Sequence, residues 1–445
     1  MPNHLLHKRL GILRFELFFD ILNSNVLNSQ TKRAFTSTVT FIMSGVYSSK
    51  ITKQTQKWDL ARSSCHGFLE STWTTFALLI AIRVFDAPES LKPLIPAFFG
   101  AGLLSSWFFT SVATKHKLTS VVPIAVFYIV GAIAYFFCGI SQQLWFYLIG
   151  ACISMICVSQ LSPFMAQVYA TNYHPKERGQ RVSTVLLTGT VFSALWAWGG
   201  GAILDANLNL WWTIFAVSTV TALLAAVIVM QIPSKHLVPK KGDNIFTNFK
   251  LLKEDKLFAV VLLGWWFIGI GNLMTQPIRV EYLANADYGI NASNYEIGIL
   301  LGTIPFVSRL FATKVWGLLF DKLNLITVRI LLNLVFMASI GLFFLTKNIA
   351  VMTIASILFG FAYGGGGVMW LLWVTKVAPP DKVSRYMSVH ATLTGVRATL
   401  APFLGYFLLV HTNPTTMSYF AIGSITLSCL IFLPLFKPMA ERTAD

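Results

Sequence analysis

The stretch SKHLVPKKGDNIFTNFKLLKEDK (residues 234–256) is the longest polar segment after the N-terminal region, and it lies between two series of apolar blocks. A helix needs about 20 mostly apolar residues to span a bilayer. Blocks of this kind lie at residues 64–85, 91–113, 119–139, 143–171, 182–204, 209–232, 257–280, 294–319, 326–346, 350–375, 385–411 and 417–436. Six spans, a long loop and six more spans predict an all-α integral membrane protein with 12 transmembrane helices in two six-helix bundles.

The composition supports this class of protein. Of the 445 residues, 55% are hydrophobic and only 12% are charged, whereas about a quarter are charged in a soluble protein. A net charge of +16 would suggest nucleic acid in a soluble domain, but here Lys and Arg cluster between the apolar blocks, so no nucleic-acid partner is predicted. The five cysteines lie in or beside apolar blocks without CxxC spacing, which favours buried thiols over a disulfide or a metal site.

The charges of the loops predict the orientation in the membrane. The even-numbered loops and the C-terminal tail carry Lys115, Lys117, Lys176, Arg178, Arg181, Lys235, Lys240, Lys241, Lys250, Lys253, Lys256, Lys314, Lys322, Lys376, Lys382, Arg385, Lys437 and Arg442. The alternate loops carry Asp86, Glu89, Asp205, Glu281, Asp287 and Glu296. Cytoplasmic loops are enriched in Lys and Arg, so both termini and the central loop are predicted to lie in the cytoplasm, in a cell membrane or a bacterial inner membrane.

The N-terminal region has two interpretations. Residues 1–62 either form a basic cytoplasmic segment on anionic lipid, or translation begins at Met43 and the residues before it are not part of the native protein. The predicted bundles then comprise residues 63–233 and 257–437, joined by the loop 234–256 and followed by a cytoplasmic tail at 438–445.

Two similar loops indicate an internal repeat. HPKERGQRVS (174–183) aligns with APPDKVSRYM (378–387), and each has a proline, then an acid, then cations before a helix. Such chemistry is common in loops, but its recurrence at the same place in each half favours duplication and pseudo-two-fold symmetry.

At this point the chain resembles the major facilitator superfamily (MFS) over residues 64–436. WGLLFDKL (316–323) is similar to the loop motif G-x-L-x-D-[RK] of that family, with Gly317, Asp321 and Lys322 at its defining positions. The resemblance implies that Gly317 allows close helix packing and that Asp321 caps a helix or pairs with charges at the cytoplasmic gate. Further matches are the Pro-x-x-Gly at residues 402–405 and PKERG before the fifth span.

The resemblance also implies alternating access about a central cavity lined by the first, fourth, seventh and tenth helices. The sequence departs from the family in the equivalent first-half loop, FFTSVATKHKLTS (108–120), which lacks both the Gly and the Asp. The fourth span has no Arg, and GTVFSALWAWGGG (189–201) lacks the Gly-Pro pair of the family's antiporters. These departures argue against a typical drug:proton antiporter.

The first span carries one isolated carboxylate. His66, Glu70 and Trp73 share one helical face with Thr74. Ionisable groups within spans are costly, so they usually meet a partner or a water-filled cavity. Glu70 is therefore either a proton carrier, with His66 as a second candidate, or a structural partner of His66 or of a loop cation.

Other spans offer candidate cavity residues. In the seventh span, Asn272, Thr275, Gln276 and Arg279 form a polar face that suits either a polar substrate or contacts between helices. Further candidates are Gln160 in the fourth span and Tyr363 and Trp370 beside the glycine run 364–367, which is expected to bend the tenth helix. The aromatic residues suit either stacking on a substrate or packing alone.

Two arginines lie within spans of the second half. Arg309 in the eighth span is expected to extend to the membrane surface or to reach Asp321. Arg397 lies midway along the eleventh span, with His390 and Thr394 on its face. No carboxylate lies at that depth in the second or fifth span, so Arg397 is predicted to contact a substrate or a water-filled cavity. His390 is a further candidate for proton coupling.

These features predict a secondary active transporter for a small polar solute of the sugar, nucleoside or organic-anion type, with proton coupling through Glu70 as one possibility. The alternatives are an efflux pump for amphipathic compounds and a non-transporting receptor or scaffold. No catalytic set, metal cluster or phosphate loop is recognisable, so neither an enzyme nor a cofactor is predicted. The expected partners are the solute, protons and the bilayer, and the chain is expected to act as a monomer.

Overall fold

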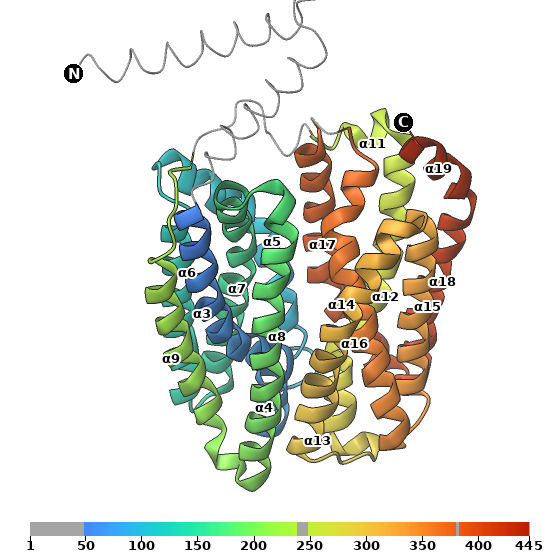
Figure 1. The fold of residues 1–445 in the computed structure, drawn as a ribbon. Coiled ribbons are helices and arrows are strands. Elements are labelled where there is room, and N and C mark those ends of the chain that lie inside the picture. The colour runs from blue at the N-terminus through green and yellow to red at the C-terminus, as the bar shows by residue number, and fades with distance from the viewer. Residues whose placement is uncertain (1–48, 238–247, 380–381, 445) are drawn as a thin grey trace, which may run out of the picture.

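The computed structural model describes residues 49–237, 248–379 and 382–444, and the regular secondary structure in these ranges is helical apart from one isolated β-bridge. The first bundle contains α3 (Ser49–Ser71), η1 (Thr72–Phe76), α4 (Ala77–Arg83), α5 (Leu94–Lys115), α6 (Val121–Ile140), α7 (Leu144–Asn172), α8 (Pro175–Ala206), η2 (Leu208–Trp211) and α9 (Trp212–Val229). The second contains α11 (Leu251–Glu254), α12 (Lys256–Ala284), η3 (Ala286–Tyr288), α13 (Asn294–Gly298), η4 (Ile299–Thr303), α14 (Ile304–Lys322), α15 (Leu325–Phe344), α16 (Ile349–Leu372), η5 (Trp373–Lys376), α17 (Val383–His411), α18 (Pro414–Phe432), η6 (Leu433–Leu435) and α19 (Phe436–Ala444). Figure 1 shows the two bundles side by side.

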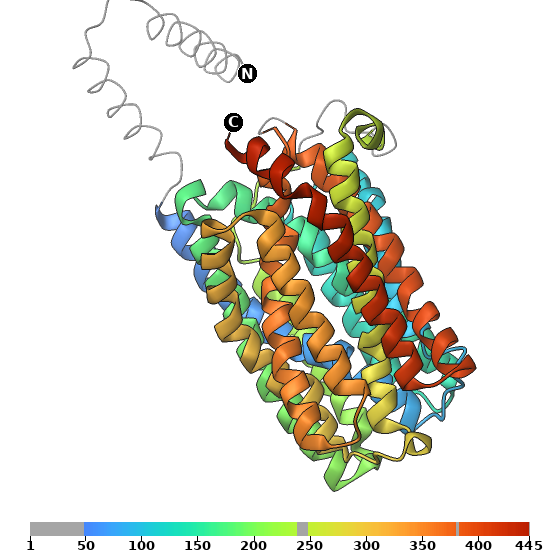
Figure 2. The ribbon, with the colours of Figure 1, turned by 90° about the vertical axis from the view of Figure 1, so that its right-hand side faces the viewer.

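The membrane-crossing helices confirm the predicted fold class. In the described part of the chain, 11 helices are long and apolar enough to cross a membrane. The helix made of α3, η1 and α4 adds a further crossing, since its backbone stays helical through the π-helical segment η1. All of these helices run along the long axis of the molecule in Figure 2. The protein is therefore an all-α membrane protein built as two helical bundles.

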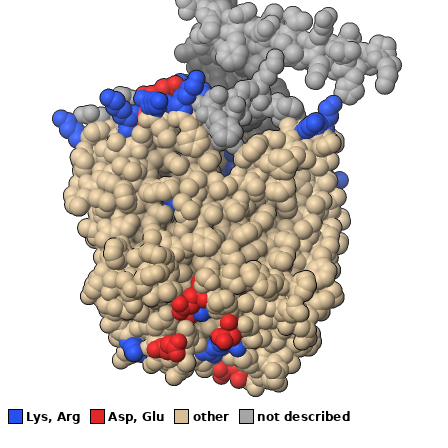
Figure 3. All heavy atoms as spheres, turned by 180° about the vertical axis from the view of Figure 1, so that it is seen from behind, with Lys and Arg blue, Asp and Glu red and all other residues tan. Residues whose placement is uncertain are grey.

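The two ends of the molecule differ in charge. The start of α3 and the end of α19 lie at the same end in Figure 1, which we call the termini end, and the opposite end is called the far end. Figure 3 shows mostly Lys and Arg at the termini end, an uncharged belt in the middle, and acidic and basic groups together at the far end. This separation agrees with the loop charges from which the orientation is predicted.

Helix starts follow from local sequence. The side chain of Asp255 accepts from the backbone N–H of Phe258 at 3.0 Å and so caps α12, while Ser293 and Glu296 form a capping box at α13. Pro175 and Pro414 stand at the first positions of α8 and α18, where a missing N–H costs nothing.

The first long helix begins earlier than the predicted first span. Helix α3 starts at Ser49, not at residue 64, because polar side chains in this segment bond inside the bundle instead of facing lipid. Arg62 pairs with Asp59 at 2.6 Å and donates to the Tyr128 hydroxyl at 2.9 Å, and Thr52 donates to the carbonyl of Asn172. A hydropathy criterion misses such a helix. Residues 1–48, with the alternative start at Met43, and residues 238–247 lie outside the described ranges.

Replacing Asp59 by Ala should destabilise the first bundle strongly. Asp59 and Arg62 are both buried, and breaking a buried ion pair from one side costs about 3–5 kcal/mol because the other charge is left uncompensated. The matched control is Glu177→Ala, since Glu177 pairs with Arg181 on an exposed helix surface, where such pairs contribute about 0–1 kcal/mol. Thermal unfolding in detergent should show a large fall in Tm for Asp59→Ala only, and equal falls would contradict the pairing.

Candidate functional site

The interface between the bundles is tight where α5 meets α17 and where α8 meets α13, η4 and α14. A Cβ placed on Gly100 would lie 2.4 Å from the backbone nitrogen of Thr399. A Cβ on Gly302 would lie 2.2 Å from the Cβ of Ala197. Because real Cβ atoms do not approach so closely, only glycine permits these contacts between helices of opposite bundles.

Polar contacts join the bundles at the far end. Lys92, in the turn before α5, pairs with Glu281 of α12 at 2.8 Å, and both side chains are buried. The second oxygen of Glu281 accepts from the hydroxyl of Tyr406 at 3.2 Å. Arg83 donates to the side chain of Asn294 at 2.6 Å, and the backbone N–H of Asn294 donates to Asp205 at 3.0 Å. The far end is thus held closed by hydrogen bonds between the bundles.

The loop motif at the termini end does not pack as the family resemblance implied. A Cβ added at Gly317 would meet no atom within 4 Å, so Gly317 is not at a close helix contact in this conformation. Asp321 and Lys322 are exposed. Burial lowers the pKa of Lys376, and the negative charge of Asp321 partly opposes that shift.

An ion pair joins the bundles near the middle of the molecule. The guanidinium of Arg309 in α14 donates to Glu70 in α3 at 2.8 Å, and the two side chains are only 19% and 14% exposed. The other oxygen of Glu70 accepts from the hydroxyl of Ser193 in α8 at 2.9 Å. The guanidinium carbon of Arg309 lies 5.5 Å from the ring centre of Tyr363 in α16. Glu70 and Arg309 thus connect four helices, of which two belong to each bundle.

The helices that carry this pair are both irregular close to it. The π-helical segment η1 begins directly after α3, which carries Glu70, and the π-helical segment η4 precedes α14, which carries Arg309. The two segments are in contact. Short π-helical stretches leave backbone groups in weaker hydrogen bonds and occur frequently at functional sites. The centre of the interface therefore combines a mostly buried ion pair with a π-helical irregularity beside each of its two helices.

Two sequence predictions are corrected here. Because α3 starts at Ser49 and the helix continues through η1 and α4, Glu70 lies well inside this helix instead of near its start. Its charged partner is Arg309, not His66 or a loop cation. Arg309 accordingly neither extends to the membrane surface nor reaches Asp321. His66 instead lies 3.4 Å from the hydroxyl of Tyr128 within the first bundle.

The remaining candidates of the first bundle are less exposed than predicted. Trp73 is half-buried and stacks on Phe99 of α5, with ring centres 5.2 Å apart. Gln160 is fully buried and donates to the carbonyl of Gly102 at 2.6 Å. Gln160 thus joins α7 to α5 within its own bundle and does not line an open cavity in this conformation.

The polar face predicted on the seventh span is divided in α12. Asn272 and Gln276 are half-buried, whereas Arg279 is buried and donates to the hydroxyl of Ser339 in α15 at 2.9 Å. Its guanidinium carbon lies 4.5 Å from the ring centres of both Phe343 and Phe359. Arg279 is therefore inside the second bundle, away from the predicted cavity wall.

Arg397 is also buried, and it uses a carbonyl as its partner. Its guanidinium donates to the carbonyl of Trp265 in α12 and to the hydroxyl of Thr394 at 3.0 Å. A Cβ on Gly269 would collide with the Arg397 side chain at 2.3 Å, so this glycine makes the space that the arginine occupies. The indole N–H of Trp370 donates to Thr394 at 3.4 Å. His390 is fully buried on the same helix.

The glycine run of the tenth span serves close packing within a continuous helix. Cβ atoms on Gly364 and Gly365 would approach α14 at 3.0 Å and 2.6 Å, whereas one on Gly367 would meet no atom within 4 Å. The run lies inside α16, which continues from Ile349 to Leu372. The predicted bend is therefore replaced by close contact with α14.

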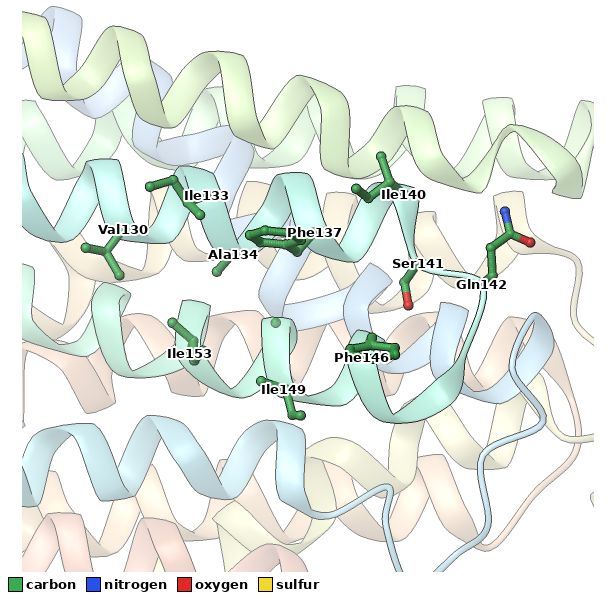
Figure 4. Close-up of a pocket in the computed structure, with 11 residues that line it drawn as sticks. Val130, Ile133, Ala134, Phe137, Ile140, Ser141, Gln142, Phe146, Ile149 and Ile153 are labelled. Carbon is green, nitrogen blue, oxygen red and sulfur yellow. The ribbon is translucent and has the colours of Figure 1, made fainter.

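A groove of about 390 Å³ lies outside the interface, between α6 and α7. Figure 4 shows its largely apolar walls, with Ser141 and Gln142 at the connecting turn. Phe137 and Phe146 on its walls are more than half exposed, as expected of side chains that face lipid in a membrane protein. The groove is therefore part of the outer surface and not of the candidate site.

The comparisons with known proteins agree with this architecture. A family model described as Major Facilitator Superfamily matches residues 65–396 and again residues 267–444. The chain belongs to the major facilitator superfamily. Membership identifies a multi-pass membrane transporter of small molecules. No curated protein sequence matches the chain.

Solved structures of superfamily transporters share the fold. The nucleoside transporter NupG matches with a TM-score of 0.66 and 11% identity, over 88% of this chain and 99% of that one. A bacterial homologue of the human lysosomal transporter Spinster, in an inward-facing and unoccupied conformation, matches with a TM-score of 0.61 and 16% identity, over 89% of this chain and 97% of that one. Identities this low establish the common fold and not a common substrate.

Proposed function

We propose that this superfamily member is a secondary active transporter that moves a small polar solute of the sugar, nucleoside or organic-anion type by alternating access. The observation that carries the proposal is the Glu70–Arg309 pair, which joins the two bundles at mid-depth. An ion pair between two rigid bodies is a contact that their relative motion must break or rearrange. Its position is therefore suited to couple binding at the centre to motion at the ends.

Glu70 is the group that we propose to carry a proton. Protonation removes its negative charge and with it the attraction of Arg309, so the arginine becomes available to a solute or to water. The hydroxyl of Ser193 remains a partner for Glu70 in either state. Because both side chains are mostly buried, breaking the pair is costly unless a proton or a solute replaces the lost partner. This requirement links proton movement to solute movement.

The solute would contact half-buried groups near the interface. We assign this role to the half-buried Trp73, Asn272, Gln276 and Trp370 and to the more exposed Tyr363, which together offer amide, hydroxyl and aromatic groups. Aromatic faces stack on sugar or base rings, and amides supply hydrogen bonds that fix orientation.

We further propose that the termini end is cytoplasmic and that the described conformation is open to the cytoplasm. The loop charges favour this orientation. The far end is closed by the Lys92–Glu281 pair and the contacts of Arg83 and Asn294, whereas added Cβ atoms at Gly179 and Gly317 would meet open space. The inward-facing Spinster homologue has a related fold.

Uptake by proteoliposomes tests the proposed function. Labelled sugars, nucleosides, organic anions and amphipathic compounds are offered separately, with and without an imposed pH gradient, and exchange is measured with solute preloaded inside. We expect at least one solute to accumulate only with the gradient and to exchange without it. If no solute accumulates or exchanges, the chain is a receptor or scaffold. If only amphipathic compounds move, and outward, the efflux alternative replaces the proposal.

A further inference from the structure

Three arginines of the second bundle are buried without a carboxylate. Arg279, Arg329 and Arg397 are 2%, 3% and 4% exposed, and none of them forms an ion pair with a described acidic residue. By contrast, the buried cations Arg62 and Lys92 and the mostly buried Arg309 each pair with one. A buried charge normally requires a compensating partner, above all within a membrane span. The excess of positive charge therefore requires an explanation.

Two of these arginines lie close to the same indole ring. The guanidinium carbon of Arg329 in α15 lies 4.1 Å from the ring centre of Trp265, and that of Arg397 in α17 lies 5.8 Å from it. The imidazole of His390 lies 5.0 Å from the same ring and 5.2 Å from the ring of Trp373. We call these five residues the Trp265 cluster. It brings two cations and a titratable ring together from α12, α15, η5 and α17 of the second bundle.

Several donors of the Trp265 cluster have no partner among the described atoms. They are Nε and Nη1 of Arg329, Nε of Arg397, both ring nitrogens of His390 and Nε1 of Trp373. An imidazole carries at least one N–H in either tautomer, so His390 is also a donor. Buried polar groups in native proteins are almost always hydrogen-bonded. A bound group that accepts hydrogen bonds, placed between these donors, would give all of them a partner.

Arg279 provides an internal comparison. It lies between the rings of Phe343 and Phe359, at 4.5 Å from each, and donates to Ser339. It is thus a single cation held by aromatic faces, without a second cation or an imidazole among these contacts. The Trp265 cluster differs because charges of the same sign gather around one ring, which is unfavourable unless a negative charge lies between them.

We propose that the Trp265 cluster binds a small inorganic anion, of a size between chloride and phosphate. Only an anion both accepts hydrogen bonds from these donors and offsets the positive charge; a cation would be repelled, and a neutral solute would leave the charge uncompensated. Thr394 accepts from Arg397 and from the half-buried Trp370, which connects the cluster to the proposed wall of the central site. The proposal does not depend on which solute is transported.

The test is anion-dependent thermal stability of the purified full-length protein. Chloride or phosphate is titrated against gluconate at constant ionic strength, since a ligand that binds only the folded state raises Tm in a saturable manner. We expect chloride, phosphate or both to stabilise the wild type saturably, and gluconate not to. The variants Arg329→Gln and Arg397→Gln should weaken the apparent affinity by roughly 10- to 100-fold, the contribution of one charge-assisted hydrogen bond. Arg279→Gln should keep the wild-type response.

Each result decides the proposal. In gluconate alone, the Arg329→Gln variant should be at least as stable as the wild type, because an uncompensated charge has been removed. If Arg329 has a purely structural role, its replacement lowers Tm instead and leaves the response to the anion intact. Equal stabilisation by gluconate, or an unchanged anion response in both arginine variants, would overturn the site. If neither arginine variant folds, His390→Phe is used, and an unchanged affinity there overturns it as well. If Arg279→Gln loses the stabilisation by the anion as well, the anion does not bind specifically at the Trp265 cluster, and the proposal is overturned.

Discussion

Replacing Glu70 by Gln should abolish gradient-driven uptake while leaving the protein inserted in the membrane. Gln keeps the size of the side chain and can still accept a hydrogen bond from Ser193, but it carries no charge for Arg309 and exchanges no proton. Because a side chain that exchanges no proton cannot couple the gradient to the solute, we expect gradient-driven accumulation to fall to the level of liposomes without the protein. Uptake into proteoliposomes with an imposed pH gradient is the measurement.

A double variant separates coupling from folding. Glu70→Gln alone should also lower Tm, since Arg309 is left buried without a partner. Glu70→Gln combined with Arg309→Gln removes both charges, so stability should recover while gradient-driven uptake stays lost. Glu177→Gln is the control, because its pair with Arg181 is exposed. Wild-type coupled uptake in the Glu70→Gln variant would exclude Glu70 as the proton carrier.

Gly302→Leu is expected to have the second large effect. A Cβ at Gly302 would lie 2.2 Å from the Cβ of Ala197, so a leucine cannot fit while η4 lies against α8. Inserting atoms into a filled contact costs about 1–3 kcal/mol or more, which penalises closure of the far end. Uptake should therefore fall about tenfold, even though the residue is remote from Glu70 in sequence.

The control for that variant lies on the facing helix. Gly199 is two residues from Ala197 on α8, and a Cβ there would meet no atom within 4 Å. Gly199→Leu should therefore transport normally and unfold at the wild-type temperature. Normal uptake by Gly302→Leu would show that the close approach of α8 and η4 is not needed for transport.

Much of the fold was predictable because the bilayer imposes a simple rule on sequence. Apolar blocks of sufficient length gave the crossings, and the polar stretch at 234–256 divided them into two bundles. The first span was misplaced for a physical reason. In the N-terminal half of α3, the polar side chains of Asp59, Arg62 and Thr52 are buried inside the bundle and paired there. These residues lower the hydropathy of the segment, although none of them exposes a charge to lipid.

The site was predictable in its components and not in its pairings. Glu70 and Arg309 were recognisable as isolated charges within spans, but their depths were uncertain while the start of the first helix was misplaced. Arg397 was interpreted as a cavity residue because no carboxylate was found for it. The partners that the structure gives it are a backbone carbonyl and a tryptophan face, and a sequence pattern of side chains cannot reveal a carbonyl partner.

Paired distance measurements at the two ends test alternating access most directly. Spin labels on Lys115 and Lys382 report the termini end, and labels on Ser90 and Thr412 report the far end, with one label of each pair in each bundle. The distances between the two labels of each pair are measured by double electron–electron resonance in lipid nanodiscs, over a range of pH and with transported solute. We predict that one distance lengthens as the other shortens, and that Glu70→Gln removes the response to pH. Two distances that stay fixed, or that change in the same direction, would contradict alternating access in this protein.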